Sequence, residues 1–252
     1  MIANHSAESS SSSRETLLVA CAWGVHLFTA SGAFLGLLAI HYAAQGDIRG
    51  AFAAMAIATV VDSADGPMAR AVHVKERAPA IDGALLDNII DYLTYVIAPL
   101  YLMIRAGVLT AGWPGLAMAA AVCLASAYGF CHVEAKSSHF RGFPSYWNLV
   151  AFYLFCLELG PAINMAIVTV LTVLVFVPIH FIYPNRTPAL RSLTLTLGVA
   201  WAVVTLAMIP ELPAHNPILL LLSLSYIAYY LVASFVMHAL EFVGRDRPMD
   251  IA

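Results

Sequence analysis

Residues 62–91 read DSADGPMARAVHVKERAPAIDGALLDNIID, and four of the aspartates in this stretch stand at helical spacing in a strongly apolar chain. These four aspartates are Asp62, Asp65, Asp87 and Asp91. The sequence on both sides is hydrophobic enough to lie in a membrane, where a charged side chain is expensive and is by default part of a functional site. We therefore expect an all-α membrane helix bundle arranged around these acids.

The spacing of the acids predicts that they share a face on each of two helices. Asp62 and Asp65 are three residues apart and Asp87 and Asp91 are four apart, so each pair lies on one side of a helix. The basic segment HVKER joins the two helices. Neighbouring helices could point four carboxylates at one another, which favours a cation between them because like charges repel. Carboxylate oxygens suit Mg²⁺, Mn²⁺ or Ca²⁺.

Small residues accompany the acids. Gly66 and Ala69 continue the face of the first pair, and Gly83 lies one turn before Asp87. They leave room for a bulky ligand against the backbone, although small residues in membrane helices more often serve close helix packing. Arg70 either binds phosphate oxygens through its fork of donors or is simply a loop charge that sets the topology.

Composition indicates an integral membrane protein. Of 252 residues, 61% are hydrophobic and 11% are charged, and the mean hydropathy is +0.82; soluble domains average about 25% charged residues. No basic face or tract supports nucleic-acid binding. The nine His and four Cys show no metal-ligand spacing, and we interpret them as structural.

Hydropathy predicts about eight transmembrane helices. The expected spans cover about residues 16–42, 50–70, 80–104, 113–134, 146–159, 161–183, 193–209 and 217–242. The fifth is short, since a crossing normally takes about 20 apolar residues. Residues 1–13 are polar and Ser-rich, and we expect a disordered tail there. The membrane domain then covers residues 14–244, and a C-terminal tail covers residues 245–252.

The cationic residues are distributed unevenly over the predicted loops. With the N-terminus inside, ten Lys and Arg lie in inner loops and tails, and only Arg49 and Arg105 lie in outer loops. This bias is typical of the positive-inside rule. Both termini and the HVKER linker are therefore expected in the cytoplasm.

The acid-rich stretch resembles the motif of the CDP-alcohol phosphotransferase family, D-x2-D-G-x2-A-R-(spacer)-G-x3-D-x3-D. All eight fixed positions match, which is a specific signal. The spacer, residues 71–82, has twelve residues rather than the common eight. The longer spacer and the later stretches HFRGFPSYWN and IYPNRTP resemble the branch of the family that uses choline.

The resemblance implies a role for each motif residue. Asp62, Asp65 and Asp87 would hold two ions, Mg²⁺ or Mn²⁺, and Asp91 would belong to the same group of acids and act as the general base. Some residues would contact the CDP-lipid: Asp62, Gly66, Ala69, Arg70, Gly83, Asp87, and two loop cations, Arg141 and Arg186. The alternative for the loop cations is topology and headgroup contact.

A choline site would need an aromatic face or a carboxylate near the quaternary ammonium. The candidates are Glu134, Tyr146, Trp147 and Tyr183. Most membrane Tyr and Trp instead form the interfacial belt, so that reading stays open for them.

The expected reaction follows from the resemblance: CDP-diacylglycerol and choline give phosphatidylcholine and CMP. The resemblance further implies a multi-pass protein of the bacterial inner membrane, a cytoplasm-facing active site, contact with membrane lipids and a homodimer. One alternative is a sister enzyme that uses serine, inositol or glycerol phosphate. A more distant alternative is a cation transporter, which gives no reason for small residues at set offsets from the acids and usually has an internal repeat.

Overall fold

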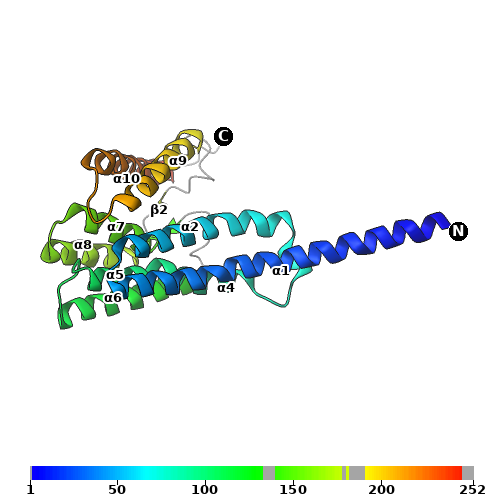
Figure 1. Cartoon of the computed structure of the whole chain (residues 1–252). Coiled ribbons are helices and arrows are strands. Elements are labelled where there is room, and N and C mark those ends of the chain that lie inside the picture. Colours follow the sequence, from blue (N-terminus) through cyan, green and yellow to red (C-terminus); the bar gives the residue numbers. More distant parts are fainter. Residues whose placement is uncertain (1, 133–139, 178–179, 182–190, 246–252) are drawn as a thin grey trace, which may run out of the picture.

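The computed structural model describes residues 2–132, 140–177, 180–181 and 191–245, with side chains over residues 13–132, 142–177 and 192–234. Within these residues the chain is almost entirely helical, as the sequence predicts (Figure 1). The longer helices are α1 (Ile2–Gln45), α2 (Ile48–Ala71), α4 (Gly83–Asp91), α5 (Ala98–Arg105), α6 (Trp113–Cys131), α7 (Trp147–Leu157), α8 (Pro161–Leu174), α9 (Arg191–Met208) and α10 (Pro217–Arg245). Shorter elements are α3 (Val74–Arg77), the π-helix η1 (Tyr92–Ile97), the 3₁₀ helix η2 (Ile209–Glu211) and the antiparallel strands β1 (Phe140–Arg141) and β2 (His180–Phe181).

Helices α1 and α2 lie side by side and form the most extensive helix contact in the described structure (Figure 1). The turn between them is encoded locally: Gly46 adopts a φ of 78°, which favours glycine. Asp47 then caps α2, because its carboxylate accepts a hydrogen bond of 2.8 Å from the backbone N–H of Gly50. Buried alanines such as Ala43 and Ala51 let the two backbones approach closely.

Helix α1 begins at Ile2, whereas we expected a disordered tail over residues 1–13. Residues 2–13 contain neither Gly nor Pro, the two residues that most disfavour a helix, so the helix of the apolar segment that follows can extend back through them. In Figure 1 the N-terminal part of α1 projects beyond the rest of the bundle. The domain boundaries at residues 14 and 245 stay predictions.

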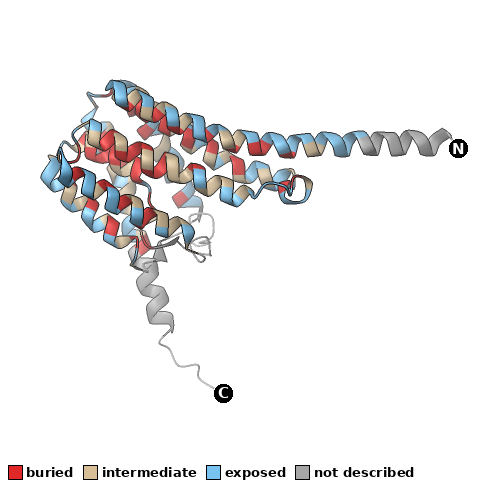
Figure 2. Cartoon of the chain, turned by 90° about the horizontal axis from the view of Figure 1, so that it is seen from below, coloured by how far each residue is buried: buried red, intermediate tan, exposed pale blue. Residues whose placement is uncertain are grey.

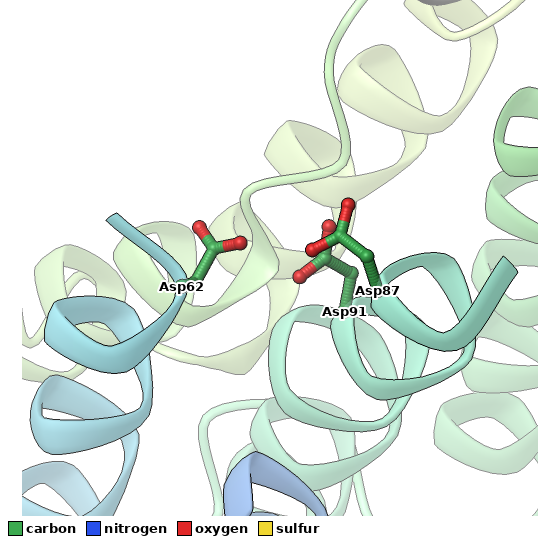
Figure 3. A group of neighbouring side chains, drawn as sticks. All are labelled: Asp62, Asp87 and Asp91. Carbon is green, nitrogen blue, oxygen red and sulfur yellow. The ribbon is translucent and has the colours of Figure 1, made fainter. Parts of the chain in front are cut away.

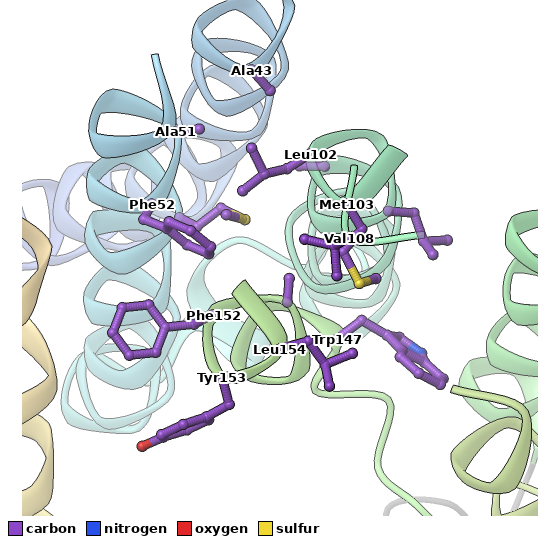
Figure 4. Packing of buried hydrophobic residues seen from close by; sticks show 14 of the residues in the cluster. Ala43, Ala51, Phe52, Leu102, Met103, Val108, Trp147, Phe152, Tyr153 and Leu154 are labelled. Carbon is purple, nitrogen blue, oxygen red and sulfur yellow. The ribbon is translucent and has the colours of Figure 1, made fainter. Parts of the chain in front are cut away.

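The core is formed mainly by α1, α2, α5 and α7 (Figure 4), and it also includes buried residues of α6, α8, α9 and α10. The ring centroids of Phe52 on α2 and Phe152 on α7 lie 5.3 Å apart at an interplanar angle of 86°, an edge-to-face contact. Trp147 is fully buried, and so are Leu102 and Met103 of α5. Figure 2 shows buried residues along the inner sides of the helices and exposed residues along the outer sides. Packing in this core therefore fixes the position of α2 relative to α5.

Helices α4 and α5 are joined by the π-helix η1, so residues 83–105 form one interrupted helix. Its first turn is capped by Asp82, whose carboxylate accepts hydrogen bonds from the N–H groups of Ala84 and Leu85. A π-helical turn is rare and is frequent at functional sites. Here it directly follows Asp91, the last acid of the motif.

Among the residues that the structure describes, five helices are long and apolar enough to cross a membrane by length and composition: Ser13–Gln45, Gly83–Arg105, Trp113–Cys131, Ser192–Glu211 and Pro217–Ser234. Leu27 and Leu124 expose 74% and 73% of their surface, which fits contact with lipid. Helices α7 and α8 are apolar but have only 11 and 14 residues. Helix α2 has 24 residues, and its acids lower its hydropathy. The polytopic membrane bundle is confirmed, and the count of eight spans stays a prediction.

Candidate active site

Three of the motif aspartates form a compact cluster. One carboxylate oxygen each from Asp62, Asp87 and Asp91 lies within 4.8 Å of the others. Figure 3 shows Asp62 on α2 facing Asp87 and Asp91 across the gap between the two helices. The arrangement matches the prediction from the spacing, in which two helices point their acids at one another.

Asp65 joins the other acids around one small space between α1, α2 and α4. This space has a volume of about 10 Å³ and is lined by all four aspartates, so it has room for about one water-sized sphere. Asp65 is 8% exposed, and its Oδ2 accepts a hydrogen bond of 2.8 Å from the Oγ1 of Thr29 on α1. Helix α1 therefore belongs to the site, which the motif alone does not indicate.

A tyrosine outside the motif fixes the orientation of Asp62. The hydroxyl of Tyr95, in η1, donates a 2.9 Å hydrogen bond to the Oδ2 of Asp62. Tyr95 is 6% exposed, and its ring contacts that of Tyr146 with a centroid distance of 5.7 Å. The sequence motif does not include Tyr95, and membrane tyrosines are most often interfacial, so the sequence alone gives no signal for this contact.

A larger cavity of about 490 Å³ lies beside the acid cluster. Six of the eight motif positions line it: Asp65, Gly66, Ala69, Arg70, Gly83 and Asp87. The wall continues into the linker through Lys75 and Glu76. The small residues thus border an open space in addition to packing helices. Two cationic residues, Arg70 and Lys75, line the same space. A phosphate-bearing ligand of nucleotide size suits this cavity.

The donor set of the acid cluster fits a divalent cation. All its candidate ligand atoms are carboxylate oxygens, which match the preference of Mg²⁺, Mn²⁺ and Ca²⁺. Carboxylates this close would repel one another strongly without a positive charge between them. The cluster can therefore hold metal, and its geometry alone does not select one ion.

The predicted choline residues have different outcomes. Trp147 is fully buried, and its Nε1 donates a 2.8 Å hydrogen bond to the Oγ of Ser126, so its ring is part of the core and is closed to a ligand. Tyr146 is 36% exposed and packs on Tyr95 next to Asp62. Some predicted residues lie outside the described side chains: Glu134, Arg141, Tyr183 and Arg186.

Comparison with known proteins defines the class. The sequence model of the CDP-alcohol phosphatidyltransferase family matches residues 25–182. The chain belongs to this family, and the match includes the whole acid cluster and the residues of α1 that complete it.

Individual relatives narrow the class. A protein of Legionella pneumophila named phosphatidylcholine synthase is 38% identical over 223 residues, which cover 85% of this chain and 87% of that protein. The phosphatidylcholine synthase of Pseudomonas aeruginosa is 37% identical over 225 residues, covering 88% and 94%. That of Rhizobium johnstonii is 34% identical over 230 residues, covering 89% and 93%. The similarity therefore extends well beyond the motif.

Proposed function

We propose that this protein is a phosphatidylcholine synthase, which transfers the phosphatidyl group of CDP-diacylglycerol to choline and releases CMP. The observation that carries the proposal is the convergence of all four motif aspartates on one space beside a nucleotide-sized cavity. The relatives named above support choline as the acceptor, because their similarity covers more than four fifths of both chains.

The protein has two tasks in this reaction: it positions the two substrates, and it removes the proton of the choline hydroxyl. The choline hydroxyl oxygen attacks the phosphorus that carries diacylglycerol, a new P–O bond forms, and the P–O bond to CMP breaks. Asp91 accepts the hydroxyl proton, a task for which it lies one turn, about 6 Å along the axis, beyond Asp87. Because the pyrophosphate is already activated, holding the reactants in line supplies much of the remaining rate.

The acids also form the proposed metal site, with Mg²⁺ or Mn²⁺ as the ion. Asp62 and Asp87 offer two of the clustered oxygens, and Asp65 completes the set of ligands from the adjacent turn of α2. Asp91 supplies the third clustered oxygen and acts as the base. When bound, such cations neutralise the phosphates and the leaving group. Tyr95 and Thr29 hold the carboxylates of Asp62 and Asp65 in place, and Arg70 and Lys75 stand where phosphate oxygens can be bound.

We assign choline to the side of the cluster where Tyr146 lies. A partly exposed ring near carboxylates is suited to a quaternary ammonium. Glu134 and Tyr183 stay candidates for the same site, and Arg141 and Arg186 for the lipid phosphate.

The proposed location is the bacterial inner membrane, with the active site facing the cytoplasm. The charge bias of ten inner to two outer cations supports this orientation. Reporter fusions at Lys75 and at both termini should give cytoplasmic signals, and a periplasmic signal at Lys75 would contradict the orientation. A homodimer is part of the same family-based proposal, and the mass of the purified protein–detergent complex tests it.

The decisive experiment measures CMP release by the purified full-length protein supplied with CDP-diacylglycerol and one alcohol at a time. We expect release with choline and little with serine, inositol or glycerol phosphate. Release with one of the other alcohols, and not with choline, would assign the protein to a sister activity. Choline movement across vesicles without CMP release would instead favour the transporter.

A further inference from the structure

His26 lies on the wall of the nucleotide-sized cavity, in helix α1 and one turn before Thr29. It is 7% exposed, and its Nε2 has no hydrogen-bond partner. The described side chains include four other buried polar atoms of this kind, in Asn88, Thr110, Asn164 and Thr205. None of those residues lines this cavity, so within the described structure His26 is the one residue of the cavity wall that carries such an atom.

The ring of His26 is held by its neighbours. Its centroid lies 6.1 Å from that of Trp23, in an edge-to-face contact. A Cβ built on Gly83 would lie 3.2 Å from the Cε1 of His26, closer than ordinary van der Waals contact. The glycine at this motif position therefore leaves room for the imidazole, in addition to any room that it leaves for a ligand.

The position of His26 relative to the acids indicates which part of a ligand reaches it. Asp65 and Asp87 line the cavity and border the acid cluster, where the proposed function places the pyrophosphate. His26 precedes the acid-bound Thr29 by one turn of α1, and Gly83 precedes Asp87 by one turn of α4. His26 thus lies about 4.5 Å along α1 from Thr29, and its neighbour Gly83 lies about 6 Å along α4 from Asp87. A nucleoside joined to that pyrophosphate can span this distance.

We propose that His26 binds the cytosine base and helps to select cytidine over uridine nucleotides. A neutral imidazole offers one N–H donor and one acceptor nitrogen, and cytosine presents acceptors at O2 and N3 and a donor at N4. Uracil carries a hydrogen on N3 and an oxygen at position 4, so a donor that matches N3 of cytosine, or an acceptor that matches its N4 amino group, is mismatched against uracil. A buried polar group without a partner gains most from a ligand that supplies one. This inference rests on one part of the proposed function, the use of a CDP-lipid as the phosphatidyl donor. It does not depend on which alcohol is the acceptor.

The test measures binding of CMP and UMP to the full-length protein in nanodiscs with Mg²⁺, by calorimetry and without any acceptor alcohol. We expect the wild type to bind CMP more tightly than UMP. In His26→Phe, which keeps a ring of similar shape, the CMP affinity should fall about tenfold while the UMP affinity changes little. His26→Asn, which keeps a donor and an acceptor, should retain part of the preference.

Controls separate recognition from folding. His41→Phe makes the same substitution at an exposed position of α1, about 22 Å along the helix, and should leave both affinities unchanged. The unliganded melting temperature of each variant reports on folding. Gly83→Ala should displace the imidazole and weaken CMP preference in the same direction as His26→Phe.

Three results would overturn the inference. The wild type could bind CMP and UMP with equal affinity, or His26→Phe could lower the affinities for CMP and UMP equally. In a parallel titration with dCMP, His26→Phe could remove a preference for CMP over dCMP and leave the preference over UMP intact, which would assign His26 to the ribose. Failure of the choline proposal gives a different pattern, in which CMP binds normally but choline elicits no CMP release.

Discussion

Gly32→Ala tests whether close packing of α1 on α4 positions the acid cluster. A Cβ at residue 32 would lie 2.7 Å from the Cγ2 of Ile90, whereas carbon atoms in contact are normally about 3.5–4.0 Å apart. Either the Ile90 side chain or the helix must therefore move by about 1 Å. Ile90 directly precedes Asp91, so a shift of α4 displaces the proposed base relative to Asp62.

The magnitude follows from two general values. Overpacking of a buried contact costs about 1–3 kcal/mol, and a displacement of about 1 Å at reacting groups can lower the rate about 10²-fold. Gly24→Ala is the matched control, because Gly24 lies on the same helix and a Cβ built on it meets nothing within 4 Å. Both variants gain up to about 1 kcal/mol of helix propensity. The difference between them therefore isolates the contact.

The assay combines unfolding in denaturing detergent with initial rates of CMP release. We expect Gly32→Ala to be about 1–3 kcal/mol less stable than Gly24→Ala and to lose most of its turnover. Adding Ile90→Ala, which removes the Cγ2, should make the effect of Gly32→Ala smaller in a double-mutant cycle. If Gly32→Ala matched Gly24→Ala in both stability and rate, close α1–α4 packing would have no part in positioning the acids.

Other predictions concern the acids and choline. Asp91→Asn should lower kcat at least about 10²-fold with little change in CDP-diacylglycerol affinity; an equal loss of that affinity in Asp87→Asn and Asp91→Asn would make Asp91 a ligand instead. Chelation with EDTA should abolish turnover, and Mn²⁺ binding, followed by electron paramagnetic resonance, should disappear in Asp62→Ala; full activity in excess EDTA would exclude metal dependence. Tyr146→Ala should raise the KM for choline more than the KM for CDP-diacylglycerol, and equal changes would remove Tyr146 from the choline site.

The sequence predicts the helices and the acid cluster well because both depend on local signals. Hydropathy identifies apolar segments, and the structure begins α6 at Trp113 and α10 at Pro217, the residues where we expected those spans to start. The i, i+3 and i, i+4 spacing of the aspartates fixes which face of a helix each acid occupies. That information was sufficient to predict that α2 and α4 bring their acids together.

Contacts between residues far apart in the chain could not be predicted in this way. The hydrogen bond from Thr29 to Asp65 and that from Tyr95 to Asp62 join residues 36 and 33 positions apart. No spacing rule specifies such a pair, and the π-helical turn further changes which side of the helix Tyr95 faces. The sequence also could not decide the role of Trp147. An aromatic residue next to Tyr146 is equally compatible with a binding site and with the core, and the structure buries Trp147 in the core.

The two acids of α2 constrain how this protein enters the membrane during synthesis. Each aspartate near the centre of an inserting helix costs about 2.5–3.5 kcal/mol, and α2 falls outside the five segments that are apolar enough to cross on composition. Its neighbour α1 emerges first from the ribosome, is strongly apolar and already carries the hydroxyl of Thr29 for Asp65. We therefore expect α1 and α2 to insert together as a hairpin. Asp62 gains its own partner only when the segment that contains Tyr95 has been translated.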